Sequence, residues 1–356
     1  PLTLEQVAPA PAESTEPAGP TVQSRDTCDL GRNNSQEVIG HDVADSVELP
    51  GGRVLFVFGD TWLGHVDDDG NRQVREDRTS SGATLPAGAG ICDELTYLTD
   101  AEGEVRKLIP VRPGDDPERY AHWPVAVAVG EYGVVVLYRR IDRGPSEDPL
   151  DFRVLGTGLA LANPDTLDFF LLEEGRLLSP EDDAEAVAIE IDPATGQPYV
   201  ISCRHGPASW TRECLLARPS APDAPFGPTE YWSDGIWSTD LDEATQILPN
   251  GADEMSLERV EWDGVARWVV VYIPPLTCEV HMQVADEPWG PYSDPIVLHE
   301  GDPADGSYCY GGKLQRSFSD AGRVVVTWVN NGTLRETYLY PDLYWPHVAE
   351  VEINTN

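Results

Sequence analysis

Short apolar runs separated by turn residues dominate the chain, and a helical period of 3.6 residues is nearly absent. Five of these runs are rich in β-branched and aromatic residues and directly follow a turn: 52–60, 132–140, 196–204, 265–273 and 322–330. Another strand-length segment precedes each of them, at 41–49, 122–130, 183–191, 255–263 and 312–319. Such pairs are typical of β-hairpins. The pattern predicts an all-β protein built on five hairpins.

The spacing of the hairpins predicts their arrangement. Equivalent positions of successive hairpins, from Phe58 to Trp328, lie 56 to 80 residues apart, which is enough for about four strands per unit. Four-stranded antiparallel sheets repeated around a central channel form a β-propeller. We therefore expect a five-bladed β-propeller. A β-sandwich with irregular hairpins is the alternative, because hairpins alone do not separate the two folds.

The beginning of the chain differs in composition from the rest. Residues 1–23 are rich in Pro and Ala and show little periodicity, which is typical of an extended N-terminal segment. We expect residues 24–356 to form a single catalytic propeller domain.

Charge limits the partners that the protein can bind. The chain carries 62 acidic and 24 basic side chains, a net charge of −38, which repels phosphate and anionic lipid. No apolar run approaches the roughly 18 residues that a membrane-spanning helix needs. We expect neither nucleic acid nor membrane as a partner, and a neutral or cationic ligand instead.

Six cysteines occur without any Cys-x-x-Cys pair, which favours disulfides over a structural zinc site. Cys203 and Cys214 flank a predicted hairpin turn and are the first expected pair. Disulfides indicate an oxidising compartment, so we expect a secreted or cell-surface protein, most simply a monomer.

In a propeller the first strand of each blade lines the channel, and the starts of these strands meet at one mouth. Acidic, aromatic and imidazole side chains occupy the predicted starts: His41, Asp42, His122, Trp123, Asp183, Glu185, Glu254, Glu258, Tyr308 and Tyr310. Carboxylates walled by aromatic rings are typical of glycoside hydrolysis, in which one acid protonates the leaving oxygen and another acts as base or nucleophile.

The first hairpin brings two of the acids together. If Gly51 and Gly52 form a two-residue turn, Asp42 lies opposite Thr61 and diagonal to Asp60, whereas a register shifted by one places Asp42 opposite Asp60. Two close carboxylates acquire different pKa values, and one of them stays protonated near neutral pH. The alternative is structural: Asp60 caps a turn and Asp42 binds loop amides.

The segment from Gly40 to Trp62 resembles the DUF4185 family, in which a Thr-Asp-Leu-Gly element is joined to a Phe-Gly-Asp-Thr element at this distance. The matching residues are Gly40-His41-Asp42 and Phe58-Gly59-Asp60-Thr61-Trp62, with further similarity at Trp123-Pro124 and at 328–331. His41 and Val43-Ala44 depart from that pattern. The resemblance implies a five-bladed propeller, catalytic positions at Asp42 and Asp60, and endo-D-arabinanase activity of the kind found in some members.

The other candidates each have a structural alternative. Glu185 and Glu258 are acids of the site or solvated strand ends, and Trp62 and Trp123 are subsite platforms or core rings. His41 and His122 orient a carboxylate, bind a channel ion or merely form hydrogen bonds, while Arg204 and Arg316 bind sugar hydroxyls or balance the acids. We expect no cofactor, although a structural cation could occupy the channel.

Taken together, these features predict a secreted glycoside hydrolase that cleaves furanosidic linkages in a polysaccharide, most specifically an endo-D-arabinanase acting on arabinan of the mycobacterial type. Two alternatives stay open. One is a non-catalytic carbohydrate-binding or surface-interaction propeller, and the other is a furanosidase acting on L-arabinan or fructan.

Overall fold

A computed structural model describes residues 20–144, 152–172, 184–206, 211–220, 229–262, 264–303, 307–320 and 322–354. In these residues the protein is all-β, as expected: the only α-helix is α1 (Leu334–Leu339), and two short 3₁₀ turns are η2 (Leu241–Glu243) and η3 (Arg316–Phe318). None of the described helices has the length and apolar character to span a membrane.

Five sheets of four or more strands follow one another along the chain, each beginning with a hairpin. The first contains β3 (Ala44–Glu48), β4 (Val54–Phe58), β7 (Ser81–Leu85) and β8 (Thr96–Tyr97). The second contains β9 (Tyr120–Gly130), β10 (Gly133–Asp142), β11 (Arg153–Ala162) and β12 (Phe170–Leu172). The third contains β13 (Glu185–Ile191), β14 (Pro198–His205), β15 (Arg212–Pro219), β16 (Thr229–Ser233), β17 (Ile236–Ser238) and β18 (Gln246–Leu248).

The remaining strands complete the set. The fourth sheet contains β19 (Met255–Trp262), β20 (Val265–Tyr272), β21 (Glu279–Ala285) and β22 (Ile296–Glu300). The fifth contains β23 (Tyr308–Leu314), β24 (Arg323–Asn331), β25 (Pro346–Asn354) and the N-terminal β1 (Thr21–Asp29). A smaller sheet of β2 (Val38–His41), β5 (Thr61–Val66) and β6 (Arg72–Arg78) extends from the first.

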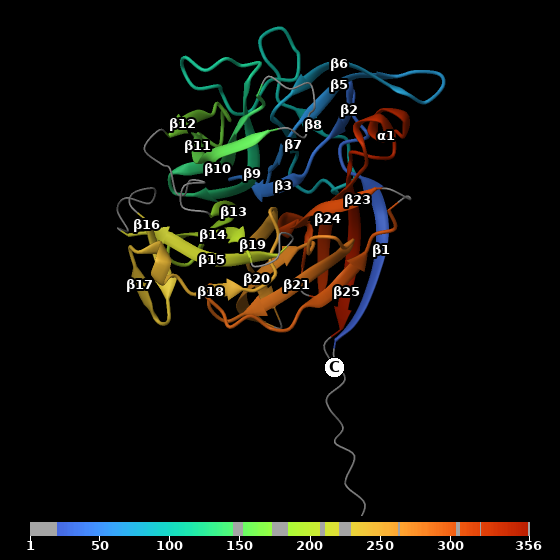
Figure 1. Cartoon of the computed structure of the whole chain (residues 1–356). Helices are drawn as coiled ribbons and strands as arrows, with labels where there is room; N and C mark the ends of the chain where they lie inside the picture. Colours follow the sequence, from blue (N-terminus) through green and yellow to red (C-terminus); the bar gives the residue numbers. More distant parts are fainter. Residues whose placement is uncertain are drawn as a thin grey trace, which may run out of the picture.

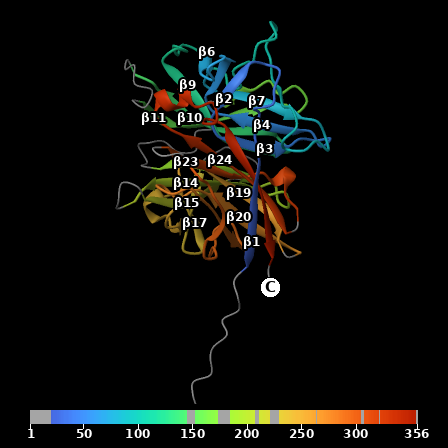
Figure 2. The ribbon, with the colours of Figure 1, turned by 90° about the vertical axis from the view of Figure 1, so that its right-hand side faces the viewer.

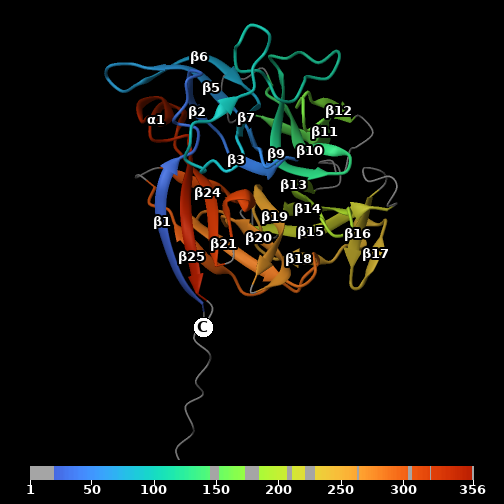
Figure 3. The ribbon, with the colours of Figure 1, turned by 180° about the vertical axis from the view of Figure 1, so that it is seen from behind.

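The first strands of the five large sheets contact one another in cyclic order: β3 with β9, β9 with β13, β13 with β19, β19 with β23, and β23 with β3. In Figure 1 the sheets of the N-terminal half occupy the upper part of the molecule and those of the C-terminal half the lower part, and Figures 2 and 3 show the same division from the side and from behind. The strand starts named above as candidates therefore belong to neighbouring elements.

Apolar cores lie between successive sheets. Val57 and Val136 share one core, Val135 and Val200 the next, and Ile201 and Val270 a third. Two further cores join the fourth sheet to the fifth and the fifth back to the first. Because each sheet is covered on both faces, its central strand is a continuous apolar run rather than an alternating one.

All five predicted hairpins are confirmed, as β3–β4, β9–β10, β13–β14, β19–β20 and β23–β24. Residue 183, the start of the third predicted segment, lies outside the described residues. The first strand of the fifth hairpin begins earlier than predicted, at Tyr308, and it also ends earlier, at Leu314. The side chain of the next residue, Gln315, bonds to Ser46, Ala44 and Thr327.

Of the two registers left open for the first hairpin, the structure has the one that places Asp42 opposite Asp60. Ala44 pairs with Phe58, and the turn is closed by hydrogen bonds between Leu49 and Arg53 and between Gly52 and Leu49. Pro50 and Gly51 occupy the central turn positions, where Pro presets φ and Gly51 takes a φ of 92°. A loop of three residues thus replaces the two-residue turn, and this selects the alternative register.

The two ends of the described chain meet in the fifth sheet, where β1 pairs with β25 from Thr21–Asn354 to Asp29–His347. The two strands lie side by side in Figures 1 and 3. The strand starts within the predicted 1–23 extension, whose residues 1–19 lie outside the described residues.

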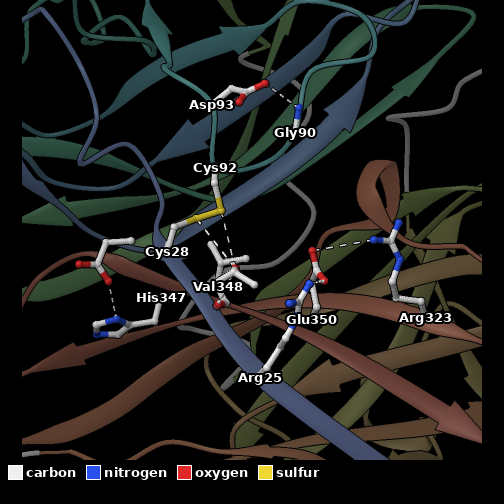
Figure 4. Close-up of a disulfide and its surroundings, with 11 residues drawn as sticks. Arg25, Cys28, Gly90, Cys92, Asp93, Arg323, His347, Val348 and Glu350 are labelled. Carbon is white, nitrogen blue, oxygen red and sulfur yellow. Dashed lines mark hydrogen bonds and ion pairs between the residues drawn. A yellow bond between two sulfur atoms is a disulfide. The ribbon is translucent and has the colours of Figure 1, made fainter.

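Three disulfides use all six cysteines. The predicted pair Cys203–Cys214 is confirmed and joins paired positions of β14 and β15. Cys278–Cys309 links the fourth sheet to the fifth. Cys28–Cys92 ties β1 to the loop after β7, beside an ion pair between Arg25 and Glu350 (Figure 4).

Candidate active site

Asp42 and Asp60 face each other at one end of the first sheet. Asp42 lies between β2 and β3, Asp60 lies between β4 and β5, and the backbone N–H of Asp42 donates to the carbonyl oxygen of Asp60 at 2.9 Å. The indole N–H of Trp123, from the start of β9, donates to Oδ1 of Asp60 at 2.8 Å. Three residues that the sequence singled out thus meet in space.

The fifth sheet contributes a tyrosine to the same place. The hydroxyl of Tyr310, on β23, donates to Oδ1 of Asp42 at 2.5 Å, and the backbone N–H of Val43 donates to the same oxygen at 2.8 Å. Both bonds favour the ionised form of Asp42. The ring of Tyr308 packs on Tyr310 with centroids 5.7 Å apart and is about half exposed, so it lies at the open side of the cluster.

Arg143 bridges two carboxylates. Its Nη2 lies 3.2 Å from Oδ1 of Asp60 and 3.1 Å from Oδ2 of Asp77, a residue of β6. The hydroxyl of Tyr344 donates to the backbone carbonyl of Asp60 at 3.2 Å. These contacts hold Asp60 from both sides and bring a third acid, Asp77, into the cluster.

Glu254 immediately precedes β19 and differs from the other acids. Among the described residues it forms no hydrogen bond and no ion pair, and it is partly exposed. Its Oε2 lies against Gly311, where a Cβ would be 3.2 Å from that oxygen and would overlap Val43. Gly311 has a φ of 65° and follows Tyr310, so the close approach places the Glu254 carboxyl beside the Asp42 cluster.

Burial and like charge raise the pKa values of the cluster. Burial raises the pKa of Asp42, with a further contribution from Asp77, and burial with the charges of Asp77 and Asp42 raises the pKa of Asp60 well above its usual value. Burial and the charge of Asp42 raise the pKa of Glu254 to about 7. Such acids do not all ionise near neutral pH, so the site holds at least one transferable proton.

Glu185, at the start of β13, lies at the edge of this cluster. It pairs with Arg139 at 3.1 Å, and Nη2 of Arg139 donates to the backbone carbonyl of Asp253 at 2.5 Å. Arg139 thus connects Glu185 with the segment that carries Glu254.

Glu258 lies within β19 and Arg316 lies in η3, beyond the end of β23, so both are away from the strand starts that carry Asp42 and Glu254. Arg316 pairs with Glu190 at 2.6 Å and with Glu258 at 3.1 Å, and Glu258 is only 6% exposed. The fully buried Lys313 donates to the backbone carbonyls of Val125 and Met255, both at 2.7 Å. Arg316 and Lys313 face these acids, yet burial and the charges of Glu190 and Asp45 still raise the pKa of Glu258 well above its usual value. Glu258 is therefore no solvated strand end, and its part in the site stays a prediction.

Two other candidates are core residues of the first sheet. His41 is fully buried against Phe58, its Nδ1 lies 3.3 Å from the backbone oxygen of Asp42, and burial lowers its pKa to about 3. Its contact is thus to the backbone of Asp42 and not to a carboxylate. The ring of Trp62 packs between Tyr338 and Tyr344, so Trp62 is a core ring and not a subsite platform.

His122 and Arg204 also lie away from the cluster. His122 is buried, its Nδ1 lies 2.9 Å from the carbonyl of Pro110, and burial lowers its pKa to about 4. Arg204 pairs with Glu213 across the β14–β15 hairpin at 3.3 Å. Neither residue reaches the acids. In the described part of the chain, no group of three or more His, Cys, Asp or Glu side chains is arranged to hold a metal ion.

Residues 30–352 match the family described as a domain of unknown function, DUF5005. The chain belongs to that family. The match corrects the expected DUF4185 membership, which rested on a short motif around Asp42 and Asp60 in the first hairpin. No curated protein shows significant sequence similarity to this DUF5005 chain.

Solved structures share the fold of this DUF5005 protein at low sequence identity. A presumed hydrolase from Bacteroides ovatus is similar with a TM-score of 0.66 and 17% identity, over 93% of this chain and 90% of that one. A family 117 glycoside hydrolase from Zobellia galactanivorans is similar with a TM-score of 0.51 and 11% identity, over 94% of this chain and 91% of that one. The α-L-arabinofuranosidase of Podospora anserina is similar with a TM-score of 0.51 and 9% identity, over 94% of this chain and 98% of that one. The chain therefore shares its fold with these solved structures.

Sequence reasoning missed Asp77, Arg143 and Tyr344 entirely. Each lies outside the predicted strand starts: Asp77 on an outer strand, Arg143 after the end of β10, and Tyr344 before β25. Glu254 was recognised as a strand-start acid but was not chosen. The signal for it is its position just before an inner strand: Glu254 lies one residue before β19, and Asp42 lies two residues before β3.

Proposed function

We propose that this DUF5005 protein is a glycoside hydrolase that cleaves furanosidic linkages in a neutral polysaccharide. One observation carries the proposal: Asp42 and Asp60 are hydrogen-bonded opposite each other, and Glu254 joins them at one end of the ring of inner strands. Acids with raised pKa values beside a fixed carboxylate are what hydrolysis of an acetal needs.

The proposed scaffold is a five-bladed β-propeller. Its support is the cyclic contact of β3, β9, β13, β19 and β23, together with the five inter-sheet cores. In this arrangement residues at the starts of different inner strands converge on one opening. That convergence explains how Trp123 of the second sheet and Tyr310 of the fifth both reach acids of the first.

Glu254 is the proposed proton donor. It lacks a counter-ion among the described residues and its side chain is partly exposed, and burial together with the neighbouring charge of Asp42 raises its pKa to about 7. A carboxylic acid protonated near neutral pH can deliver its proton to the leaving oxygen of the glycosidic bond.

Asp42 is the proposed base or nucleophile. The hydrogen bonds from Tyr310 and Val43 stabilise its ionised form and fix its orientation. Asp60, held by Trp123 and Arg143, places a fixed carboxyl group beside it that can form hydrogen bonds with sugar hydroxyls. The exposed ring of Tyr308 offers an apolar face to the C–H surface of a sugar.

The proposed substrate is a furanose polymer. The similarity to an α-L-arabinofuranosidase supports a furanoside, and the excess of acids disfavours an anionic polymer. D-Arabinan of the mycobacterial type is the first polymer to test, with L-arabinan and fructan as alternatives. The three disulfides support a secreted or cell-surface location for such an enzyme.

The test is a panel of polysaccharides incubated with the purified protein, with released oligosaccharides separated by thin-layer chromatography. We expect products from one furanose polymer and loss of at least 100-fold in rate for Asp42→Asn and Asp60→Asn. The matched control Asp234→Asn, in an exposed turn of the third sheet, should retain wild-type rate. Binding of a polymer without any product would instead favour the carbohydrate-binding alternative.

A further inference from the structure

A small polar cavity lies beside the second sheet, away from the acid cluster. Its lining comes from the loop before β9 and from the ends of β10 and β11, and its volume is about 90 Å³. The lining residues are Arg112, Tyr138, Arg140, Leu155, Gly156 and Thr157. Pockets for organic ligands usually have at least about 300 Å³, so this one suits a much smaller molecule.

Two arginines give the cavity a positive balance. Arg140 donates through Nε and Nη2 to Asp115, at 3.1 Å and 2.7 Å. Arg112 forms no ion pair and no side-chain hydrogen bond with any described residue, although its Nε is buried. The two guanidinium groups and the one carboxylate leave a net charge of about +1 at this place, in a chain whose net charge is −38.

The cavity is also supplied with unused hydrogen-bond donors. Tyr138 is 1% exposed, and its hydroxyl has no partner among the described residues. The buried Nε–H of Arg112 likewise has none. A buried donor without a partner costs about 1–3 kcal/mol, so a molecule with several acceptor oxygens is favoured in this space. His122, whose Nε2 also lacks a partner, does not line the cavity.

We propose that the cavity between Arg112 and Arg140 binds a small tetrahedral oxyanion, phosphate or sulfate. The planar guanidinium of Arg112 offers two parallel N–H groups to such an ion, and Tyr138 donates a third bond. The small size disfavours a sugar ring, while the positive balance and the unpaired donors disfavour a metal cation. Asp115 stays paired with Arg140 and keeps that side chain at the wall of the cavity.

The site has a structural connection to the acid cluster. Arg140 and Tyr138 flank Arg139 on β10, and Arg143, which bridges Asp60 and Asp77, lies three residues beyond Arg140. An ion that joins the loop around Arg112 to the end of β10 stabilises the strand end from which Arg143 extends. The inference concerns binding only, so its test does not depend on any hydrolytic activity.

The experiment is titration of the full chain with sodium phosphate and with sodium sulfate, read by isothermal calorimetry and by thermal unfolding, at ionic strength held constant with sodium chloride. We expect saturable heat and a rise of Tm by several degrees with phosphate or sulfate relative to chloride alone. Arg112→Gln should abolish both effects, and Tyr138→Phe should weaken binding about tenfold. The control Arg323→Gln, whose side chain pairs with Asp320 in the fifth sheet, should bind like the wild type.

Two results would overturn the proposal. If neither oxyanion gives more heat or stabilisation than chloride, the cavity holds only water. If Arg112→Gln or Tyr138→Phe binds with unchanged affinity, the ion binds elsewhere. Should Arg112→Gln prove poorly folded, calorimetry on Tyr138→Phe, which removes one hydroxyl and keeps the ring, decides the matter alone.

Discussion

The hydroxyl of Tyr310 donates to the carboxylate of Asp42 at 2.5 Å, across 268 residues of sequence. The bond joins the fifth sheet to the first. Among the described residues it is the only hydrogen bond that the Asp42 carboxylate receives from another side chain, since the bond from Val43 comes from a backbone N–H. The Tyr310 bond links the contact between the fifth and first sheets to the charge state of the proposed base, so the packing of these sheets and the proposed chemistry depend on the same bond.

Replacement of Tyr310 by Phe should raise the pKa of Asp42 further, because a hydrogen bond to the ionised form is lost. If Asp42 acts as an ionised base, the acidic limb of the profile of kcat/KM against pH moves to higher pH, and the maximum falls about tenfold. The control is Tyr308→Phe, whose exposed ring forms no bond to Asp42. Profiles that coincide for wild type and Tyr310→Phe would contradict this role.

Glu254→Gln should remove the proton donor. Because its pKa is about 7, activity of the wild type should fall as pH rises through 7, and the variant should lose this basic limb together with about 100-fold or more of its rate on polymer. Aryl furanosides with acidic leaving groups need little protonation and should be affected far less. Glu185→Gln, the matched rim acid paired with Arg139, should keep the basic limb. The reverse result would move the role to Glu185.

Folding stability should decrease from about pH 4.5 to pH 7 through Glu190. Burial raises its pKa to about 7 despite the pairing with Arg316, so the folded state holds a proton that the unfolded chain has already released. The free energy of unfolding then falls by up to about 1.4 kcal/mol per pH unit in this window and levels off above it. Urea unfolding at several pH values measures how the free energy of unfolding changes with pH. This dependence should be smaller for Glu190→Gln than for the wild type, and unchanged for the control Glu352→Gln, whose side chain is exposed.

The Cys28–Cys92 disulfide should contribute more stability than Cys203–Cys214. It closes a loop of 64 residues against 11, and the loop-entropy relation gives about 4 kcal/mol for the longer loop and about 3 kcal/mol for the shorter. Replacing each pair by Ser and measuring guanidinium unfolding checks the order. A larger loss for the Cys203–Cys214 pair would show that local packing, rather than restraint of the N-terminal strand, determines the contribution.

Several features of the fold follow from local patterns. The apolar runs and their turn residues predicted all five hairpins, because strand periodicity and turn chemistry act within a few residues. The pairing of Cys203 with Cys214 followed for the same reason, since both lie in one hairpin. The register at Asp42 could not be predicted from local patterns. It depends on a loop of three residues that begins at Pro50, and a two-residue turn is equally compatible with the amino-acid sequence there.

The sequence by itself determined the strand-rich class, the hairpin count, the acidic character and the adjacency of Asp42 to Asp60 within one residue of register. Only the tertiary structure decided which distant side chains reach them. Arg143, Asp77 and Tyr344 arrive from segments with no local signature, while Glu258 and Trp62, equally plausible in the sequence, are drawn into the interior. The reason is physical: strand pairing is set by neighbours in the chain, whereas the partners of a carboxylate at a strand end depend on how the sheets pack around the ring.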